Sequence, residues 1–294
     1  TSASKNDAIW FDILSEHGAT EFLGYSLESA EAKVTCLLQN NLKCQQIIEE
    51  GAEFVLITNQ TPFYGEAGGQ IGDTGVALGS NCKIIIKDTL KYLGKVTAHI
   101  CVLEKGEIKL GDVVSLNIDL IHRDNLRIHH TGTHILHAVL RKILGQHVTQ
   151  KGSLVLPNKL RFDFSHPKAL TRSEIYQIEK EVNRIIINNS DVITEIMHAD
   201  DASKKGAMAL FGEKYEEEVR VVTLGQGDYT EFSMELCGGT HVTRTGNIGV
   251  FKIISEMGIA AGIRRIEAVC GEFAFEEFLV AKQQFLLQSK IQSV

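Results

Sequence analysis

The sequence predicts an α+β fold, in which a small β-barrel subdomain precedes an α+β core. Three observations support this prediction. Short apolar runs separated by glycine-containing turns fill residues 20–119, an amphipathic helix follows them, and further helices are then mixed with mostly consecutive strands. We expect a lead-in at residues 1–19, the barrel at 20–119, the core at 120–275 and a C-terminal helix at 276–294.

The expected barrel begins after a loose or helical lead-in. Its clearest strands are short, rich in β-branched residues and closely spaced, which is typical of a barrel or sandwich. They lie at residues 53–58, 82–87, 97–103 and 112–119, with an exposed turn at 104–111.

The composition is that of an ordinary soluble chain. Its 294 residues are 44% hydrophobic and carry a net charge of −7, which argues against broad, non-specific binding to nucleic acid and against DNA as a partner. Apolar runs are too short for a membrane helix. Six scattered cysteines favour a reducing compartment, the cytoplasm. The net charge does not exclude a local basic patch, although most of the basic residues taken singly fit solvated faces of the protein. The candidates for such a patch are Arg141, Lys142, Lys151, Lys159, Arg161, Lys168, Arg172, Arg264 and Arg265.

The core is expected to open with a helix from Ile128 to about Leu144. Its apolar residues form one stripe, whereas His130, His134 and His137 fall on the opposite side. Gly145 ends the helix. A packed helix that directs imidazoles away from its own core contact is the arrangement that a metal site needs. The stripe consists of Ile135, Leu136, Val139, Leu140, Ile143 and Leu144.

The remaining helices and strands are predicted from the spacing of their apolar residues and from capping signals. A second helix at 171–188 starts with the capping box Thr171-Arg-Ser-Glu174. Strands are expected at 152–156, 160–164, 193–198, 219–224, 249–256 and 262–269, a short helix or loop at 200–211, and a closing helix at 273–294.

Two distant motifs predict a metal centre. The first sets His130 and His134 one helical turn apart, and the second supplies Cys237 and His241. Either pair alone is weak evidence, because histidines and cysteines are often simply buried. Together they form one sulfur and three nitrogen ligands, a plausible set for a single Zn²⁺. His137 remains open as a further ligand or supporting donor, and His129 points elsewhere on the helix.

Other segments carry weaker signals. The glycine-rich segment Tyr64–Gln70 does not fit the P-loop or dinucleotide spacing, so it is either a loop that contacts a polymeric ligand or a β-turn. Gln150, Arg161 and Asp163 could line a site, but an Arg-x-Asp pair is as often a structural ion pair. The GxSxG nucleophile motif is absent.

Several of these motifs together resemble the editing domain of alanyl-tRNA synthetases. The resemblance covers roughly residues 20–275, with the motifs in the family's order and spacing. The segments that carry it are 61–70, 129–137, 150–155, 160–166, 206–215, 237–241 and 258–269.

The resemblance implies a function. The family's editing domain hydrolyses tRNA(Ala) mischarged with serine or glycine, whereas the parent enzyme attaches alanine with ATP. By matching positions, His130, His134, Cys237 and His241 would bind zinc, and Thr133 and Gln150 would serve the amino-acid pocket as the candidate catalytic residues. Gly68 and Gly69 would handle the tRNA acceptor end, and Arg161 and Asp163 are added as substrate-binding candidates.

Nothing in the sequence resembles the aminoacylation core or the carboxy-terminal tRNA domain, so we expect editing without charging. Residues 10–25 resemble the segment that joins the synthetase core to the editing domain, which favours a fragment over a free-standing editing protein. Two other classes stay open: a non-catalytic zinc module that only binds tRNA, and a metallohydrolase of small esters or amides. Salt dependence of binding would separate RNA binders from the latter.

Overall fold

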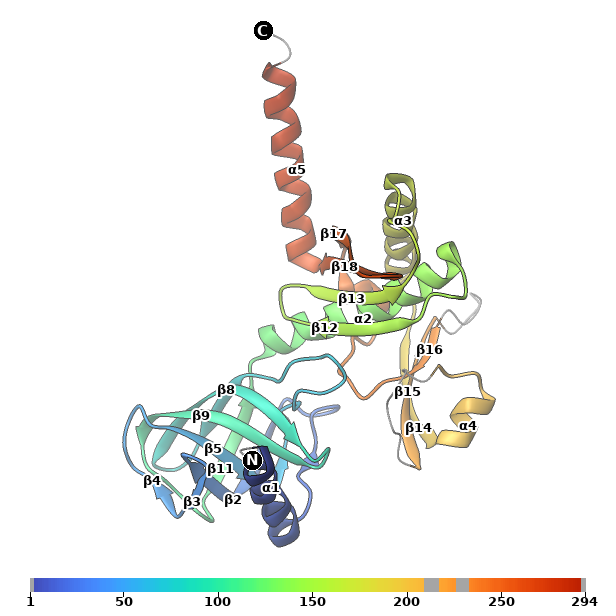
Figure 1. Cartoon of the computed structure of the whole chain (residues 1–294). Coiled ribbons are helices and arrows are strands. Elements are labelled where there is room, and N and C mark those ends of the chain that lie inside the picture. Colours follow the sequence, from blue (N-terminus) through green and yellow to red (C-terminus); the bar gives the residue numbers. More distant parts are fainter. Residues whose placement is uncertain (1–2, 209–216, 226–232, 292–294) are drawn as a thin grey trace. The chain divides into compact units, whose positions relative to one another are not determined.

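The chain forms two compact units in a computed structural model that describes residues 3–208, 217–225 and 233–291 (Figure 1). The first unit comprises Thr1–Ala67 and Ile71–Arg123, and the second comprises Gly68–Gln70 and Asp124–Val294. The glycine-rich segment is therefore divided, and its last three residues group with the second unit.

The first unit is a closed barrel with a helix packed on it. Six strands are each hydrogen-bonded to the next in the order β11-β7-β8-β9-β5-β2, and β11 pairs back with β2 to close the sheet. Closure leaves these six strands no free edge between them. β3 extends the sheet beyond β2, and two small pairings join β1 to β6 and β10 to β4. The elements are α1 (Ala3–His17), β1 (Glu21–Phe22), β2 (Ser29–Gln39), β3 (Leu42–Cys44), β4 (Gln46–Ile47), β5 (Glu53–Thr58), β6 (Gln60–Thr61), β7 (Gly75–Leu78), β8 (Cys82–Tyr92), β9 (Val96–Gly106), β10 (Ile108–Lys109) and β11 (Val113–Ile118).

Alternating burial along the strands fills the barrel. Leu37, Leu56 and Leu103 are fully buried in one cluster, as the period of two in a strand requires when only one face meets the core. Outside this cluster α1 places Trp10 and Ile13 against the sheet, and the Trp10 ring stacks on Tyr92 with centroids 3.7 Å apart.

A buried ion pair joins four segments of the first unit. The Arg123 and Asp73 side chains are both fully buried and are joined by several N–H···O contacts. Arg123 also donates to the carbonyl oxygens of Gly24 and Pro62, each at 2.8 Å. The guanidinium is therefore compensated by one carboxylate and two backbone oxygens, as a buried charge requires.

In the second unit, the part of helix α2 from Asp124 onward packs with two antiparallel sheets and a further helix. One sheet has the order β12-β13-β18-β17 and the other β14-β15-β16. Figure 1 shows α5 projecting from the first of these sheets. The elements are α2 (Leu120–Leu144), β12 (Gln150–Val155), β13 (Leu160–Ser165), α3 (Arg172–Asn188), β14 (Val192–His198), α4 (Ala199–Lys204), β15 (Glu218–Leu224), β16 (Ser233–Leu236), the short 3₁₀ helix η1 (Thr245–Ile248), β17 (Phe251–Ala260), β18 (Ile263–Cys270) and α5 (Gly271–Ile291).

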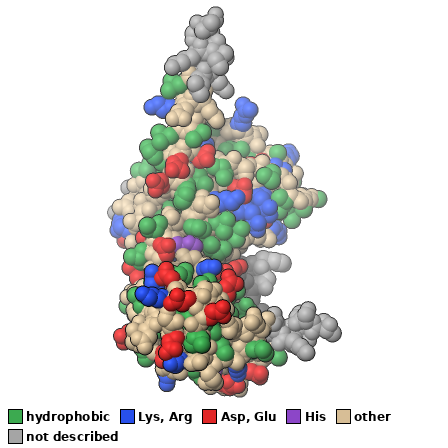
Figure 2. Space-filling model, turned by 90° about the vertical axis from the view of Figure 1, so that its left-hand side faces the viewer, with side chains coloured by type: hydrophobic (Ala, Val, Ile, Leu, Met, Phe, Trp, Pro, Cys, Tyr) green, Lys and Arg blue, Asp and Glu red, His purple; other side chains and the backbone are tan. Residues whose placement is uncertain are grey.

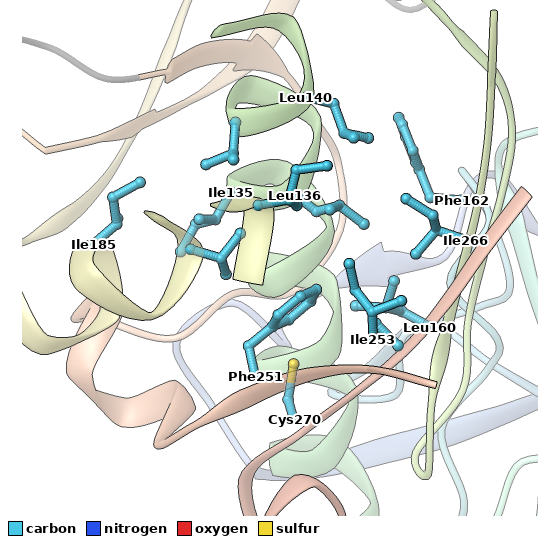
Figure 3. Packing of buried hydrophobic residues seen from close by; sticks show 14 of the residues in the cluster. Ile135, Leu136, Leu140, Leu160, Phe162, Ile185, Phe251, Ile253, Ile266 and Cys270 are labelled. Atoms are coloured by element: carbon cyan, nitrogen blue, oxygen red, sulfur yellow. The ribbon is translucent and has the colours of Figure 1, made fainter. Parts of the chain in front are cut away.

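The core of the second unit holds one face of α2. Figure 3 shows Ile135, Leu136 and Leu140 of this helix directed at apolar side chains of the surrounding strands and of α3. Val139 completes the buried stripe, whereas Ile143 and Leu144 are partly buried. The predicted separation of a core face from a histidine face is confirmed.

Most predicted elements are confirmed, and the α+β class with a barrel is correct. Residues 53–58 form β5, and α3 carries the predicted capping box at Thr171. The prediction of an exposed turn at 104–111 is wrong, because β9 continues to Gly106 and β10 follows. The helix begins at Leu120 rather than Ile128, because Asp119 accepts the backbone N–H of His122 at 3.1 Å and so caps an earlier turn. The end of the predicted element at 200–211 and residues 292–294 lie outside the described residues.

Two further observations concern the described parts of the chain. All six cysteines are free. No helix there combines the length and the apolar character that crossing a membrane requires.

Removing the charge of Asp73 should destabilise the first unit. Asp73→Asn leaves the buried Arg123 without its carboxylate, and we expect a loss of about 3–5 kcal/mol in the free energy of unfolding. The single tryptophan, Trp10, lies in this unit, so its fluorescence during urea unfolding measures the effect. Glu104→Gln, which breaks the exposed pair with Lys83, should leave the stability nearly unchanged. Equal effects of the two changes would contradict this account.

Candidate metal centre

Helix α2 carries two of the four predicted ligands. His130 and His134 are one turn apart, and each is 5% exposed. Their rings stack with centroids 5.2 Å apart and an interplanar angle of 14°. Because the opposite face of α2 is fixed in the core, the helix presents both imidazoles in a defined direction.

The loop after β16 carries the other two. Cys237 and His241 follow the strand, and Arg220 donates to the carbonyl oxygens of Cys237 and Gly239 at 3.0 and 2.8 Å. A Cβ atom on Gly239 would lie 2.0 Å from Cε1 of His130. The loop can therefore approach α2 this closely only with glycine at that position.

The four side chains meet at one point. Their ligand atoms all lie within 4.8 Å of one another. The Sγ of Cys237 is 3.4 Å from Nε2 of His130 and 3.3 Å from Nε2 of His241. The Nε2 of His134 is buried and has no hydrogen-bond partner among the described residues. Such an orphaned nitrogen is costly unless it binds something, and a tetrahedral metal ion with one sulfur and three nitrogen ligands fits this set.

The other ring nitrogen of each imidazole is held from outside. The Nδ1 atoms of His130, His134 and His241 contact Gln70 at 2.7 Å, Glu235 at 2.6 Å and Thr131 at 3.3 Å, respectively. Partners of this kind fix the tautomer, so that Nε2 carries the lone pair that a metal accepts.

The charges of the cluster call for a cation. Burial favours the neutral thiol of Cys237, but the three surrounding histidines lower its pKa well below the usual value. Burial also lowers the pKa of His134, yet Glu235 and Cys237 outweigh it and raise this pKa to about 10. Burial lowers the pKa of His241 to about 3, so this ring is neutral. A divalent cation would supply the positive charge that protonated His134 otherwise carries beside a thiolate and a carboxylate.

Two neighbouring histidines are not part of the cluster. His129 is held by the backbone at both nitrogens, because its Nδ1 contacts Asn125 O at 2.8 Å and its Nε2 accepts the N–H of Cys270 at 3.1 Å. His137 contacts Glu235 at 3.1 Å through Nδ1, and its buried Nε2 has no partner among the described residues. Glu235 therefore joins His137 to the candidate ligand His134.

The two predicted pocket residues, Thr133 and Gln150, make no hydrogen bond to the cluster among the described residues. Thr133 precedes His134 in α2, is 4% exposed and donates its hydroxyl to His129 O at 2.8 Å. Gln150 is half-buried at the start of β12. Among the described residues, neither side chain is hydrogen-bonded to one of the four candidate ligands.

The other predicted residues are on and beside the sheet. Asp163 accepts two hydrogen bonds from Arg265 at 2.6 and 2.7 Å, although the pair weighed from the sequence was that of Asp163 with Arg161. Arg161 lies 3.9 Å from the same carboxylate. Gly68 and Gly69 lie in the segment that follows the edge of β12. Most of the motif at 206–215 lies outside the described residues.

Besides Thr131, sequence reasoning missed two residues that touch the candidate ligands, Gln70 and Glu235. Both are buried, with exposures of 0% and 2%. Gln70 ended a motif that was quoted only for its glycines. Glu235 lies in β16, two residues before Cys237, and this short spacing between a carboxylate and a candidate ligand was the available signal.

Neutralising Glu235 should weaken metal binding. Glu235→Gln keeps the size of the side chain but removes the charge between His134 and His137, and we expect zinc affinity to fall about 10- to 100-fold. Competition with a chromogenic chelator measures it. The exposed Glu218 on β15 offers a matched control, since Glu218→Gln should keep the original affinity. The same affinity in both variants would argue against an outer role for Glu235.

Comparisons with known proteins place the chain among aminoacyl-tRNA synthetases. Residues 2–121 match the family of tRNA synthetases class II (A). The sequence alone had shown no resemblance to the aminoacylation core in these residues. Residues 219–267 match the threonyl and alanyl tRNA synthetase second additional domain. Over 286 residues, 97% of the chain, it is 57% identical to the alanine–tRNA ligases of Rickettsia felis and Rickettsia akari and 56% identical to that of Rickettsia prowazekii. The chain spans 32% of the length of these relatives.

Proposed function

Since this chain belongs to the alanine–tRNA ligase family, we propose that it is the part of such an enzyme that hydrolyses tRNA(Ala) mischarged with serine or glycine. The observation that carries the proposal is the buried cluster of one cysteine and three histidines, two of which, Cys237 and His241, lie within the match to the second additional domain. We propose Zn²⁺ as its ion and the cytoplasm as its location, because free cysteines are typical of a reducing compartment. In the parent enzyme, attachment of alanine with ATP would be the task of other parts.

The chain's own residues have defined tasks in this proposal. His130, His134, Cys237 and His241 would hold the zinc, which when bound supplies a positive charge for polarising the ester or positioning the substrate. With four protein ligands the shell is closed, so we propose that one of them is displaceable. Thr133 is suited to accept a hydrogen bond from the serine hydroxyl, because its own proton is donated to His129 O while its lone pairs stay available.

The proposed substrate is the acceptor end of the tRNA. A group of Lys and Arg side chains lies right of centre on the face drawn in Figure 2, whereas in the lower part of this view such side chains are mixed with Asp and Glu. A local group of this kind supports phosphate contacts on a chain whose net charge is −7. Gly68, Gly69, Arg161 and Asp163 remain proposed contacts to this substrate.

One alternative has an observation of its own. Four protein ligands without an open position are typical of structural zinc sites. That arrangement favours a non-catalytic zinc module that binds tRNA, and the first of the following experiments separates the two functions.

Deacylation of Ser-tRNA(Ala) tests the proposed function. The purified chain should hydrolyse Ser-tRNA(Ala) and leave Ala-tRNA(Ala) largely intact, and Cys237→Ala should lose the activity because the metal set is incomplete. Cys44→Ala removes a thiol outside the centre and should retain the activity. A zinc-loaded, folded chain that binds tRNA(Ala) without hydrolysing the ester would establish the non-catalytic module instead.

Selectivity is tested at Thr133. Thr133→Val removes the hydroxyl but keeps the shape, and the preference for serine over alanine should fall, since a site that hydrogen-bonds a hydroxyl rejects the analogue lacking it by up to ~10⁴–10⁵. Rates of Ser-tRNA(Ala) and Ala-tRNA(Ala) hydrolysis measure the ratio. Thr133→Ser keeps the hydroxyl and should keep the preference. An unchanged ratio in the valine variant would refute this role.

A further inference from the structure

Gly69 and Gln70, at the end of the glycine-rich segment, lie beside β12, the edge strand of the four-stranded sheet. Gly69 O accepts the backbone N–H of Val155 at 2.7 Å, and Gln70 pairs with Val155 in a parallel bridge. A Cβ atom on Gly69 would lie 2.7 Å from Ser153 O, and its φ of +84° also favours glycine. The glycine allows the backbone to approach β12 closely, and this placement fixes where the next side chain, that of Gln70, begins.

The Gln70 side chain ends in the metal centre. It is fully buried, and its Oε1 contacts Nδ1 of His130 at 2.7 Å and accepts the backbone N–H of Thr240 at 3.0 Å. Its Nε2 donates to Oγ1 of Thr240 at 2.9 Å. One amide therefore contacts α2 and the loop between Cys237 and His241, which are 60 and 170 residues away from it along the chain.

These contacts fix the orientation of the amide and the tautomer of His130. A backbone N–H can only donate, so the atom of Gln70 that faces Thr240 N must be the oxygen. The same oxygen faces Nδ1 of His130, which must then carry the proton. The lone pair is left on Nε2, the atom that lies 3.4 Å from Cys237 Sγ and belongs to the ligand set.

We propose that Gln70 is a positioning residue of the metal centre, which holds His130 in its metal-binding tautomer and fixes Thr240 within the ligand loop. The end of the glycine-rich segment is in this way a part of the centre, in addition to any contact its glycines make with tRNA. This inference rests on the metal-binding part of the proposed function, and it is independent of the hydrolysis itself.

The chain offers substitutions that separate the contacts. Gln70→Ala removes all of them, and Gln70→Asn keeps the amide but is one methylene too short. Gln70→Glu keeps an oxygen that can accept from both His130 Nδ1 and Thr240 N. Gln177 is an exposed glutamine on α3, and Gln177→Ala is the matched control.

The test measures binding of Zn²⁺ to the whole chain by chelator competition, together with the absorption spectrum of the Co²⁺ form. We expect zinc affinity to fall about 10- to 100-fold in Gln70→Ala and Gln70→Asn, with an altered Co²⁺ spectrum, as for other outer partners of metal ligands. Gln70→Glu should recover most of the affinity, and Gln177→Ala should match the original chain. Circular dichroism shows which variants are folded, and Gln70→Asn carries the comparison if the alanine variant is not.

Each outcome decides a separate point. If the original chain binds zinc and the folded alanine or asparagine variant binds it equally well, Gln70 has no positioning role and the inference fails alone. If the glutamate variant is as weak as the alanine variant, the tautomer argument fails. If the original chain binds no zinc, the proposed metal site fails together with the inference.

Discussion

The convergence of four candidate ligand atoms on one point is the constraint on which the proposed site of the second unit depends. Two of these atoms come from α2 and two from the loop after β16, and all lie within 4.8 Å of one another. Neither element holds this geometry alone. The apolar face of α2 packs into the core, which directs His130 and His134 toward the loop after β16, while glycine at position 239 lets that loop approach the helix. Packing of the apolar face of α2 therefore fixes the positions of the candidate ligands on its opposite face.

Hydrogen-bond partners outside the cluster fix the orientation of its three imidazole rings. Gln70, Glu235 and Thr131 each hold the Nδ1 atom of one imidazole, so every Nε2 faces the shared point. The partners are drawn from a β12-edge segment, a strand and the helix itself. A small displacement of any of these elements would change a tautomer or a ring direction, and metal affinity depends on both.

Local patterns in the sequence predicted much of this, and long-range pairing explains the rest. The apolar stripe of α2 and the capping box at Thr171 repeat within a few residues, so their period alone reveals them. Closure of the barrel by β11 and β2 joins distant strands, and no local pattern encodes that pairing. Asp119 was an overlooked capping signal for the earlier start of α2. The contact of Gln70 with Thr240 spans 170 residues, and only the folded chain reveals it.

X-ray absorption spectroscopy of the zinc-loaded chain tests the central claim most directly, because it counts the atoms bound to the ion. The account predicts one zinc per chain with a shell of one sulfur at about 2.3 Å and three nitrogens at about 2.0–2.1 Å. The sulfur contribution should disappear in Cys237→Ser. A shell of nitrogen and oxygen without sulfur, or the same sulfur signal in the variant, would contradict a centre built from these four side chains.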